Sequence, residues 1–329
     1  MTKLGFGVTF IMKQSRKLRI AVLVATYNGE RFIEQQLDSI LKQKGITNYD
    51  YQVFVYDDGS QDGTGKILRK YGDDIRIIPK DPKYQGIKSA IYSLLHQVEA
   101  DIYYFSDQDD VWAPDKVIQM QSAWKKLKQT EPGGVYSDLL LVDGQNHTLG
   151  KTMMSANGWG SDEERDLSFL ILNPRVTGAA FSINRAARDL VLQLPKSEFL
   201  KVTMHDSFLA LLTSSFNNLA FLPKPLVRYR QHGSNQIGAK RTIWQEINVL
   251  KRLASLQKRL EDIAILQELI SELPTSVQSR VKIYANFAMR KNPFTRIALV
   301  LKNRVCWEHT PILKILIILF TGVSARRIL

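Results

Sequence analysis

The first half of the chain alternates short apolar runs with amphipathic segments. Residues Arg19–Thr26 (RIAVLVAT) are almost continuously apolar, as expected of a strand that is buried on both faces of a sheet. Residues Glu30–Lys44 then carry apolar side chains at helical spacing. Further strands are expected at Tyr51–Tyr56, Ile75–Ile78 and Ile102–Phe105, and further helices at Thr64–Tyr71 and Ile87–Glu99. Strands that alternate with helices over such short distances predict an α/β fold with a parallel, doubly wound sheet.

The pattern changes twice in the second half of the chain. It first becomes mixed, with strands expected at Val135–Val142, Gly178–Ile183 and Ala220–Tyr229. After Lys240 it becomes helical, and Pro274 and Pro293 divide this part into about three helices. We therefore expect a loose leader over residues 1–18, an α/β domain over residues 19–239, and a helical C-terminal region over residues 240–329.

Positive charge is concentrated in the C-terminal region. The formal net charge of the chain is +13, and residues 240–329 contain 16 Lys or Arg against 6 Asp or Glu. This excess favours an anionic partner, either lipid or nucleic acid, although a solvated helical surface explains it equally well. The apolar run Ile312–Val323 is too short to cross a bilayer and contains Lys314. The single cysteine, Cys306, suits a reducing compartment. We therefore expect a cytoplasmic protein that lies peripherally on the inner face of the cell membrane.

Polar clusters directly follow three of the predicted strands. They are Thr26-Tyr27-Asn28-Gly29-Glu30, Asp57-Asp58-Gly59-Ser60 and Ser106-Asp107-Gln108-Asp109-Asp110. Ligands of open α/β sheets bind beyond the carboxyl ends of the strands, so these clusters are candidates for a binding site. Asp57 and Asp58 are suited to accept hydrogen bonds from a base N–H or from ribose hydroxyls. The structural alternative for this second cluster is a loop with ordinary turn chemistry.

The third cluster carries the clearest chemistry. Its carboxylates, Asp107, Asp109 and Asp110, would repel one another unless a cation were present. Mg²⁺ and Mn²⁺ prefer carboxylate oxygens and share their coordination with substrate phosphates. An Asp-x-Asp pair at a strand end therefore predicts a site for a metal ion and a diphosphate. The structural alternative is a solvated acidic turn before the helix that Pro114 starts.

Two further segments contain candidate reactive side chains. Asp206 follows His205 and precedes an apolar helical run, so it is either a general base or an acidic residue favoured by the dipole of a helix start. The neighbouring sequence does not decide between these two roles. Arg228, Arg230 and His232 lie close together near the end of the mixed segment. They could clamp a diphosphate and supply a metal ligand.

Taken in order, these motifs resemble the inverting glycosyltransferases of family 2, which have the GT-A fold. The motifs are Ala25-Thr26-Tyr27-Asn28-Gly29-Glu30, Asp57-Asp58-Gly59-Ser60, Asp107-Gln108-Asp109 and His205-Asp206. Within this family, the chain most resembles the bacterial rhamnosyltransferases of streptococcal cell-wall and capsular polysaccharides. The features that carry this resemblance are Ser106–Trp112 (SDQDDVW), Val176-Thr177-Gly178, Met204-His205-Asp206 and Tyr229-Arg230-Gln231-His232. The resemblance extends from about Arg19 to Ala239.

The resemblance implies a role for each motif residue. The base and ribose of a nucleotide-sugar donor would be held by Thr26, Tyr27, Asn28, Glu30, Asp57 and Asp58. The donor would also be contacted by Gly86, Lys88, Asp107 and Gln108, and at its diphosphate by Arg228 and Arg230. Asp109 would bind Mn²⁺ or Mg²⁺, with His232 as a second ligand. Asp206 would be the general base, next to His205, where many relatives have Glu.

The function implied is the transfer of L-rhamnose, with inversion, from dTDP-β-L-rhamnose to a hydroxyl of a lipid-linked glycan in cell-wall or capsular polysaccharide synthesis. A UDP-linked glucose, galactose or N-acetylhexosamine is the alternative donor. The first loop, Tyr27–Arg31, lacks the Gly-x-Gly-x-x-Gly pattern of a dinucleotide enzyme. A nucleic-acid partner would leave the acidic clusters unexplained, so none is expected. The C-terminal region would bind an anionic membrane surface or form a homodimer interface.

Overall fold

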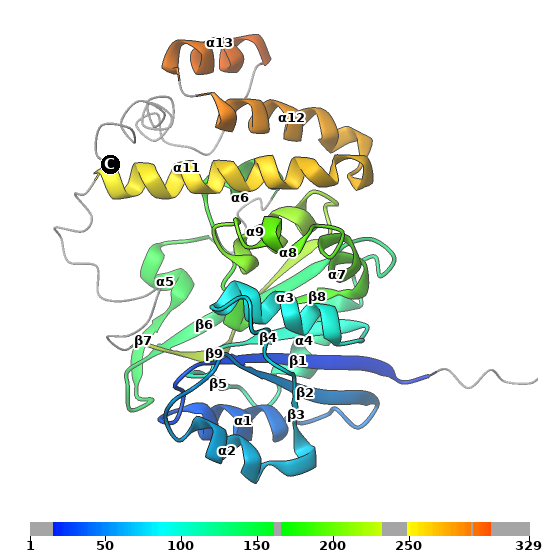
Figure 1. Ribbon diagram of the computed structural model, residues 1–329, viewed down its shortest axis with the longest axis vertical. Helices are drawn as coiled ribbons and strands as arrows, with labels where there is room; N and C mark the ends of the chain where they lie inside the picture. Colours follow the sequence, from blue (N-terminus) through cyan, green and yellow to red (C-terminus); the bar gives the residue numbers. More distant parts are fainter. Residues whose placement is uncertain (1–15, 161–165, 232–248, 291, 304–329) are drawn as a thin grey trace, which may run out of the picture.

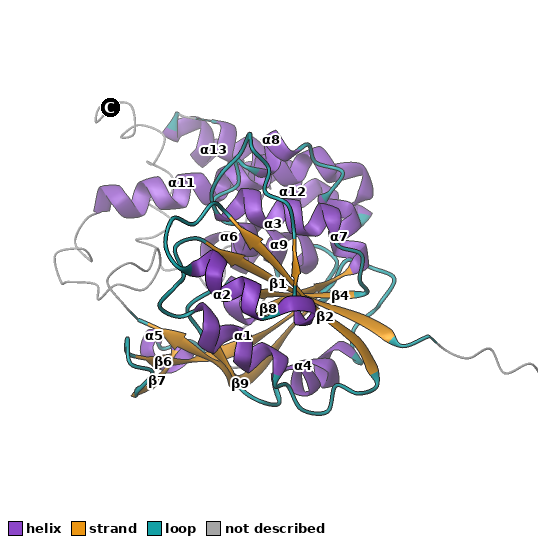
Figure 2. Cartoon of the chain, turned by 60° about the horizontal axis from the view of Figure 1, so that its bottom comes forward, coloured by secondary structure: helices purple, strands orange, loops and turns teal. Residues whose placement is uncertain are grey.

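The computed structural model describes residues 16–160, 166–231, 249–290 and 292–303. Most of the expected leader, His232 and the apolar run at 312–323 lie outside these ranges. Nine strands within them form one twisted sheet with helices on both faces (Figures 1 and 2). They are β1 (Leu18–Thr26), β2 (Tyr49–Asp57), β3 (Arg76–Ile77), β4 (Ile102–Ser106), β5 (Val111–Trp112), β6 (Gly134–Val142), β7 (Thr148–Thr152), β8 (Phe181–Asn184) and β9 (Leu219–Arg230). The predicted α/β class is confirmed.

The helices agree with the pattern of the sequence where they are long. They are α1 (Ile33–Leu41), α2 (Thr64–Lys70), α3 (Ile87–Gln97), α4 (Lys116–Trp124), α5 (Met153–Asn157), α6 (Leu167–Leu172), α7 (Arg185–Val191), α8 (Lys196–Phe199), α9 (His205–Ser214), α11 (Val249–Leu266), α12 (Thr275–Met289) and α13 (Pro293–Asn303). Pro274 directly precedes α12 and Pro293 begins α13, so the expected division of the C-terminal region is confirmed. The short helices between β6 and α9 were not predicted, because one or two turns show little periodicity.

The N-terminal half of the sheet is parallel, in the order β3-β2-β1-β4. Alternate side chains of β1 enter two apolar cores, with Leu23 in one and Val22 in the other. Helices cover both faces, which explains why β1 is apolar at almost every position. Thr26 pairs with Asp57, and Val24 of β1 pairs with Ser106 of β4. The three polar clusters therefore meet at one edge of the sheet.

The C-terminal half of the sheet is mixed, in the order β4-β8-β6-β9-β5. The contacts of β8 with β4 and β6 are antiparallel, whereas β9 runs parallel to β6 and antiparallel to β5. A wholly parallel sheet is thus found in the first half alone. Residues Gly178–Ala180 form a 3₁₀ turn, so the strand expected from Gly178 begins at Phe181. The β5–β9 pair brings the segment after the third cluster beside the end of β9, where Arg230 lies.

The helices α11 and α12 pack on the rest of the protein through a shared core. Leu260 and Ile263 of α11 and Val281 of α12 are fully buried, in the same apolar cluster as Phe208 and Leu212 of α9. Figure 1 shows α11 lying across α6 and α9, with α12 stacked on its outer side. None of the helices among the described residues combines the length and the apolar character needed to span a membrane.

Candidate active site

The carboxyl edge of the sheet borders a cleft of about 470 Å³. Nine of the residues predicted from the sequence line it: Thr26, Tyr27, Asn28, Asp58, Gly86, Asp107, Gln108, Asp109 and Asp206. These residues come from four loops and from the first turn of α9, which lie far apart along the chain. The fold therefore gathers most of the predicted site around one cavity.

The loops after β1 and β2 are tied together by hydrogen bonds between side chains and backbone. Asn28 Oδ1 accepts a hydrogen bond from Gln61 N at 2.8 Å, and Glu30 Oε2 accepts one from Gly63 N at 2.9 Å. Asn28 has a left-handed backbone with φ of 48°, which asparagine tolerates better than most residues. Asn28 thus has a structural task as well as a place in the cleft wall. Glu30 lies outside the cleft lining.

The carboxylates at the end of β2 have different surroundings. Asp57 Oδ1 accepts hydrogen bonds from the backbone N–H groups of Gly59 and Ser60 and from the Ser60 hydroxyl, so it closes the turn rather than lining the cleft. Asp58 faces the cleft, where its Oδ2 accepts a hydrogen bond from Gly86 N at 2.6 Å. Its Oδ1 is buried and has no hydrogen-bond partner. Asp58 therefore ties the loop before α3 to the end of β2, and its second carboxylate oxygen lacks a hydrogen-bond partner in the protein.

Gln108 connects the third cluster to the first. Its Oε1 accepts hydrogen bonds from the Thr26 hydroxyl at 2.6 Å and from Tyr27 N at 2.8 Å, and its Nε2 donates to Tyr27 O at 3.1 Å. On the other side of the acidic segment, Gln36 Nε2 donates to Asp107 O at 2.9 Å. The backbone of the acidic segment is therefore fixed before any ligand binds.

The acidic segment holds more negative charge than the protein around it balances. Burial, together with the charges of Asp109 and Asp206, raises the pKa of Asp107 to about 7. Burial and the charges of Asp107 and Asp109 also raise the pKa of Asp110, although Arg230 N donates to its Oδ1 at 3.0 Å. Asp110 Oδ2 is buried without a hydrogen-bond partner. The nearby Lys116 is directed at a backbone oxygen, Ala179 O, at 2.8 Å.

These observations fit a divalent cation. Carboxylates whose pKa values rise because of mutual repulsion are stabilised as anions when a cation binds among them. No three His, Cys, Asp or Glu side chains in the described ranges are arranged to hold an ion by themselves. Mg²⁺ is commonly bound by one or two carboxylates and completes its coordination with substrate phosphates. Asp109, with Asp107 beside it in the cleft wall, suits that arrangement.

Asp206 lies in the first turn of α9 with both carboxylate oxygens held by backbone groups. Gly178 N donates to Oδ2 and Ser207 N donates to Oδ1, each at 2.7 Å. The Asp206 side chain is almost buried, at 5% exposure, yet it lines the cleft. Next to it, His205 packs edge-on against Phe105, and burial lowers its pKa, so the imidazole is neutral at neutral pH. Asp206 and the neutral His205 therefore add no positive charge to this wall of the cleft.

Three predicted donor-binding cations lie outside the cleft lining. Lys88 Nζ donates to Leu200 O and Val202 O at 2.5 and 2.7 Å. Arg228 holds Asn146 through its side-chain and backbone oxygens. Each cation donates to carbonyl oxygens of the protein. These acceptors replace water around the charged group, so its partial burial is tolerated. In the structure, Lys88 and Arg228 therefore support loops.

Arg230 has the same kind of surroundings and is 2% exposed. Its guanidinium donates to Asp109 O at 2.7 Å, Gly144 O at 3.0 Å and Gln35 Oε1 at 2.7 Å. Arg230 thus fixes the backbone of the acidic segment from behind instead of facing the donor. His232, the second predicted metal ligand, lies outside the described residues.

Some cleft residues had no predicted role. Thr177, Gly178, Met204 and Tyr229 line the cleft. They lie within motifs that carried the family resemblance, so the resemblance was the available signal. The hydrogen bond from Gly178 to Asp206 joins residues 28 positions apart, and no local pattern predicts it.

Solved structures of glycosyltransferases have a similar fold. S. aureus TarS 1–349 in complex with UDP-GlcNAc gives a TM-score of 0.50 at 16% identity, over 94% of this chain and 92% of that chain. The mannosyltransferase PcManGT from Pyrobaculum calidifontis, in complex with GDP-Man and Mn²⁺, gives 0.51 at 17% identity, over 95% and 81%. At such low identities the likeness concerns the fold alone, and it confirms the expected GT-A fold.

Similarity of sequence identifies the family. The dTDP-rhamnosyl transferase RfbG of Shigella flexneri is 30% identical over 230 residues, which are 66% of this chain and 74% of that protein. An uncharacterized glycosyltransferase of Nostoc is 25% identical over 227 residues, which are 66% of each. The model of glycosyl transferase family 2 matches residues 21–189, about half of the chain. The chain therefore belongs to glycosyl transferase family 2.

Proposed function

We propose that this family 2 glycosyltransferase is an inverting, metal-dependent enzyme that transfers L-rhamnose from dTDP-β-L-rhamnose to a hydroxyl of a lipid-linked glycan. The observation that carries the proposal is the cleft, which Asp58, Asp109 and Asp206 line together. These residues supply a hydrogen-bond acceptor for the nucleoside, a carboxylate for a metal–diphosphate complex, and a base. The similarity to a dTDP-rhamnosyl transferase supports the choice of donor.

The nucleoside end of the donor would bind beside Thr26, Asn28 and Asp58. The Asp58 carboxylate, which lines the cleft, would accept a hydrogen bond from the base N–H or from the sugar hydroxyl of the nucleoside. The loops that carry these residues are already tied together, so little ordering is needed on binding, and this reduces the entropic cost of association. The assignment predicts that Asp58 affects donor affinity more than turnover.

Asp206 would remove the proton from the attacking acceptor hydroxyl. Two backbone N–H groups fix its carboxylate, and each oxygen keeps a lone pair for the incoming proton. As the proton moves to Asp206, the acceptor oxygen forms a bond to the anomeric carbon of the donor. The bond between that carbon and the diphosphate oxygen breaks on the opposite face, so a β-linked donor gives an α-linked product.

Negative charge grows on the leaving diphosphate during this step. A divalent ion bound in the cleft would offset that charge. Asp109 and Asp107 would hold the ion, while Gln108 and Arg230 keep the backbone of this segment in place through the hydrogen bonds described above. Preorganised charges of this kind stabilise a transition state without further rearrangement.

A panel of nucleotide sugars tests the proposed donor. Purified protein would be incubated with dTDP-rhamnose, UDP-glucose, UDP-galactose and UDP-N-acetylglucosamine, and nucleotide release and donor affinity would be measured. We expect dTDP-rhamnose to bind most tightly and to be turned over fastest. A preference for UDP-N-acetylglucosamine would instead favour the UDP-hexose alternative, which the fold likeness to TarS keeps in view.

We also propose that residues 240–329 form a C-terminal region that packs on the transferase domain of residues 19–239 and binds anionic lipid on the cytoplasmic side of the membrane. The support is its excess of basic residues, together with exposed apolar side chains such as Met289 and Phe294, which are 71% and 78% exposed. Vesicles with anionic lipid should retain the protein at low salt and release it at high salt. Equal binding to neutral vesicles would contradict this proposal, and a salt-independent dimer would favour a homodimer interface.

A further inference from the structure

The loop before Asp206 is held by a buried acidic residue from the C-terminal helices. This loop, residues 200–204, follows α8 and leads directly into α9. Asp262 of α11 is 1% exposed, and its Oδ1 accepts a hydrogen bond from Thr203 N at 2.7 Å. The contact spans 59 positions in the sequence. A residue of α11 therefore fixes the backbone three residues before Asp206.

A partly buried cation of another helix, Lys88 of α3, holds the same loop. Lys88 of α3 donates to Leu200 O and Val202 O, on either side of an exposed residue, Lys201. Together, Lys88 and Asp262 engage three backbone groups of the loop. Backbone groups that are held by charged side chains form stronger hydrogen bonds than neutral pairs do. The loop is therefore clamped between α3 and α11.

The two clamping residues also interact electrostatically. Burial raises the pKa of Asp262 to about 7 and lowers the pKa of Lys88, while the charge of each opposes the shift of the other. Arg259, one turn earlier on α11, adds a second positive charge near Asp262. Removing one member would leave buried charge without its partner, which is costly in a protein interior. The charges of Asp262, Lys88 and Arg259 are therefore coupled to one another.

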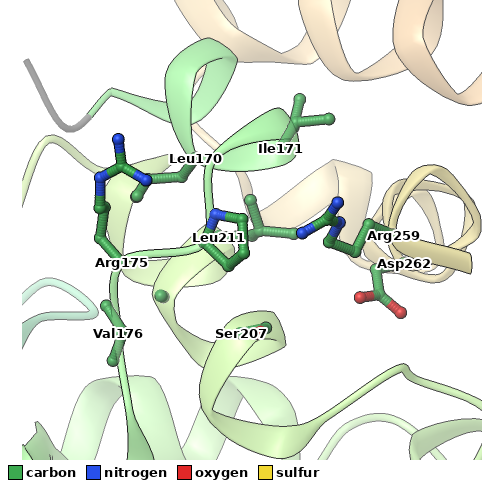
Figure 3. A pocket seen from close by; sticks show the side chains of 10 residues that line it. Leu170, Ile171, Arg175, Val176, Ser207, Leu211, Arg259 and Asp262 are labelled. Atoms are coloured by element: carbon green, nitrogen blue, oxygen red, sulfur yellow. The ribbon is translucent and has the colours of Figure 1, made fainter. Parts of the chain in front are cut away.

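Two of these residues, Asp262 and Arg259, also lie near the first turn of α9. Asp262 and Arg259 line a small cavity together with Ser207 and Leu211 of α9, as Figure 3 shows. Ser207 is the residue whose N–H donates to Asp206. Charged residues of α11 therefore lie against both the loop that enters α9 and the turn that carries the carboxylate.

We propose that Asp262 and Lys88 are positioning residues, which hold the loop so that α9 presents the Asp206 carboxylate to the acceptor. The inference rests on the proposed function, in which Asp206 is the general base. It gives α11 a part in the reaction, through the loop, that differs from membrane attachment. It also gives Lys88 a role that does not require contact with the donor.

The test compares Asp262→Ala with Asp262→Asn in the full-length protein. The matched control is Glu268→Gln, because Glu268 is an exposed acid in the helical turn that follows α11. Asn keeps an oxygen that can accept the hydrogen bond of Thr203. We expect the Ala variant to lower kcat about tenfold while the donor Kd is unchanged, since a small misplacement of a catalytic group is enough. The Asn variant should keep most activity, and the control all of it.

A second readout reports the loop directly. Trypsin cleaves after Lys201, whose side chain is 62% exposed, so a loosened loop should be cut faster in the Ala variant than in the Asn variant or the control. If Asp262→Ala does not fold, Lys88→Met and Lys88→Arg test the clamp from α3. Arg keeps the donors and should retain activity, whereas Met should lose it. Wild-type kcat and cleavage rates in the Ala or Met variant would overturn the inference.

A double mutant separates this inference from the proposed function. If Asp262 acts through Asp206, adding Asp262→Ala to Asp206→Asn should not lower the residual rate further. The same fractional loss in both backgrounds would overturn the positioning role. If Asp206→Asn alone is as active as the wild type, the proposed function fails. If Asp206→Asn is inactive while Asp262→Ala is fully active, the proposed function stands and only this inference fails.

Discussion

Gly178 N donates a hydrogen bond to Asp206 Oδ2 at 2.7 Å, across 28 positions of sequence. Gly178 begins the 3₁₀ turn before β8, whereas Asp206 belongs to α9. A carboxylate oriented by the backbone of another element keeps its direction when nearby side chains move. The pair therefore defines where an acceptor hydroxyl must lie if Asp206 is the base.

The first prediction concerns the proton transfer itself. Asp206→Asn keeps the size of the side chain and an oxygen for the Gly178 hydrogen bond, but it cannot take a proton. We expect a folded protein with unchanged donor affinity whose turnover falls by a factor on the order of 10²–10⁴. Turnover would be measured with a lipid-linked or synthetic glycoside acceptor, and donor affinity by calorimetry. Near wild-type turnover would remove Asp206 from the mechanism.

The second prediction concerns the space around Gly178. A Cβ atom there would lie 3.0 Å from His205 Nε2 and 3.5 Å from Asp206 Oδ2. His205 is buried against Phe105 and cannot easily move away, so Gly178→Ala should displace Asp206 and lower kcat by about 10- to 100-fold. Gly65→Ala is the matched control, because Gly65 lies in α2 with only ordinary contacts to a new methyl group. The control should gain about 0.5–1 kcal/mol of stability and keep its activity.

The third prediction concerns the metal ion. Asp109→Ala should lower transfer by about 100-fold or more and weaken donor binding, because the diphosphate would lose the cation that offsets its charge. An excess of chelator should have the same effect on the wild type, and Mn²⁺ or Mg²⁺ should restore activity. Asp73→Ala, at an exposed acid, is the control. Full transfer activity in excess chelator is the result that would falsify metal dependence.

The fourth prediction concerns pH and stability. Burial disfavours the charged form of Asp262 and raises its pKa from 3.8 to about 7 in the folded protein. The protonated Asp262 carboxyl therefore contributes to the free energy of unfolding. This contribution is complete below about pH 4 and is lost as the pH rises through 7. The charges of Lys88 and Arg259 and the hydrogen bond from Thr203 N act in the opposite direction.

Urea unfolding at several pH values checks this prediction. The free energy of unfolding of the wild type should fall between pH 6 and pH 8 relative to that of Asp262→Asn, whose amide does not titrate. Titrating groups that do not interact with Asp262 contribute equally to both proteins, so the difference reports Asp262 together with the coupled Lys88 and Arg259. Parallel pH profiles for the two proteins would show that Asp262 does not titrate in this range.

The fifth prediction concerns Arg230. Arg230→Lys would lose the planar group that bonds to Asp109 O, Gly144 O and Gln35 at once. We expect a loss of about 1–3 kcal/mol of unfolding free energy, because buried acceptors would be left unsatisfied. Arg280→Lys, at a half-exposed ion pair with Asp166, should change stability little. Unchanged stability together with weaker donor binding would contradict this prediction and indicate that Arg230 contacts the donor.

The sequence predicted the parallel half of the sheet well, for a physical reason. A strand such as β1 that is covered on both faces must be apolar at nearly every position, and that pattern is visible without a structure. The ends of β1 and β2 coincide in register, as shown by the Thr26–Asp57 pair, so polar clusters at strand ends meet in space. The apolar pattern of the strands and the shared register of their ends explain why most of the residues that line the cleft could be predicted.

The roles of the cations Lys88 and Arg230 could not be predicted in the same way. Lys88 contacts carbonyl groups 112 and 114 residues later, and Arg230 contacts Gln35 195 residues earlier. A charged residue near a binding motif looks the same in the sequence whether it faces the ligand or the protein. Asp262 gave no signal at all, since an acidic residue in a basic helix ordinarily faces water.

The shared core of α9, α11 and α12 has a consequence for synthesis on the ribosome. The strands and the cleft loops are complete once the chain has reached β9, but Asp262 emerges later and Val281 of α12 later still. Until then, the apolar side of α9 lacks its cover and the loop before Asp206 lacks one of its holds. Domains fold as units during synthesis. A nascent chain stalled near residue 231 would therefore expose part of its core.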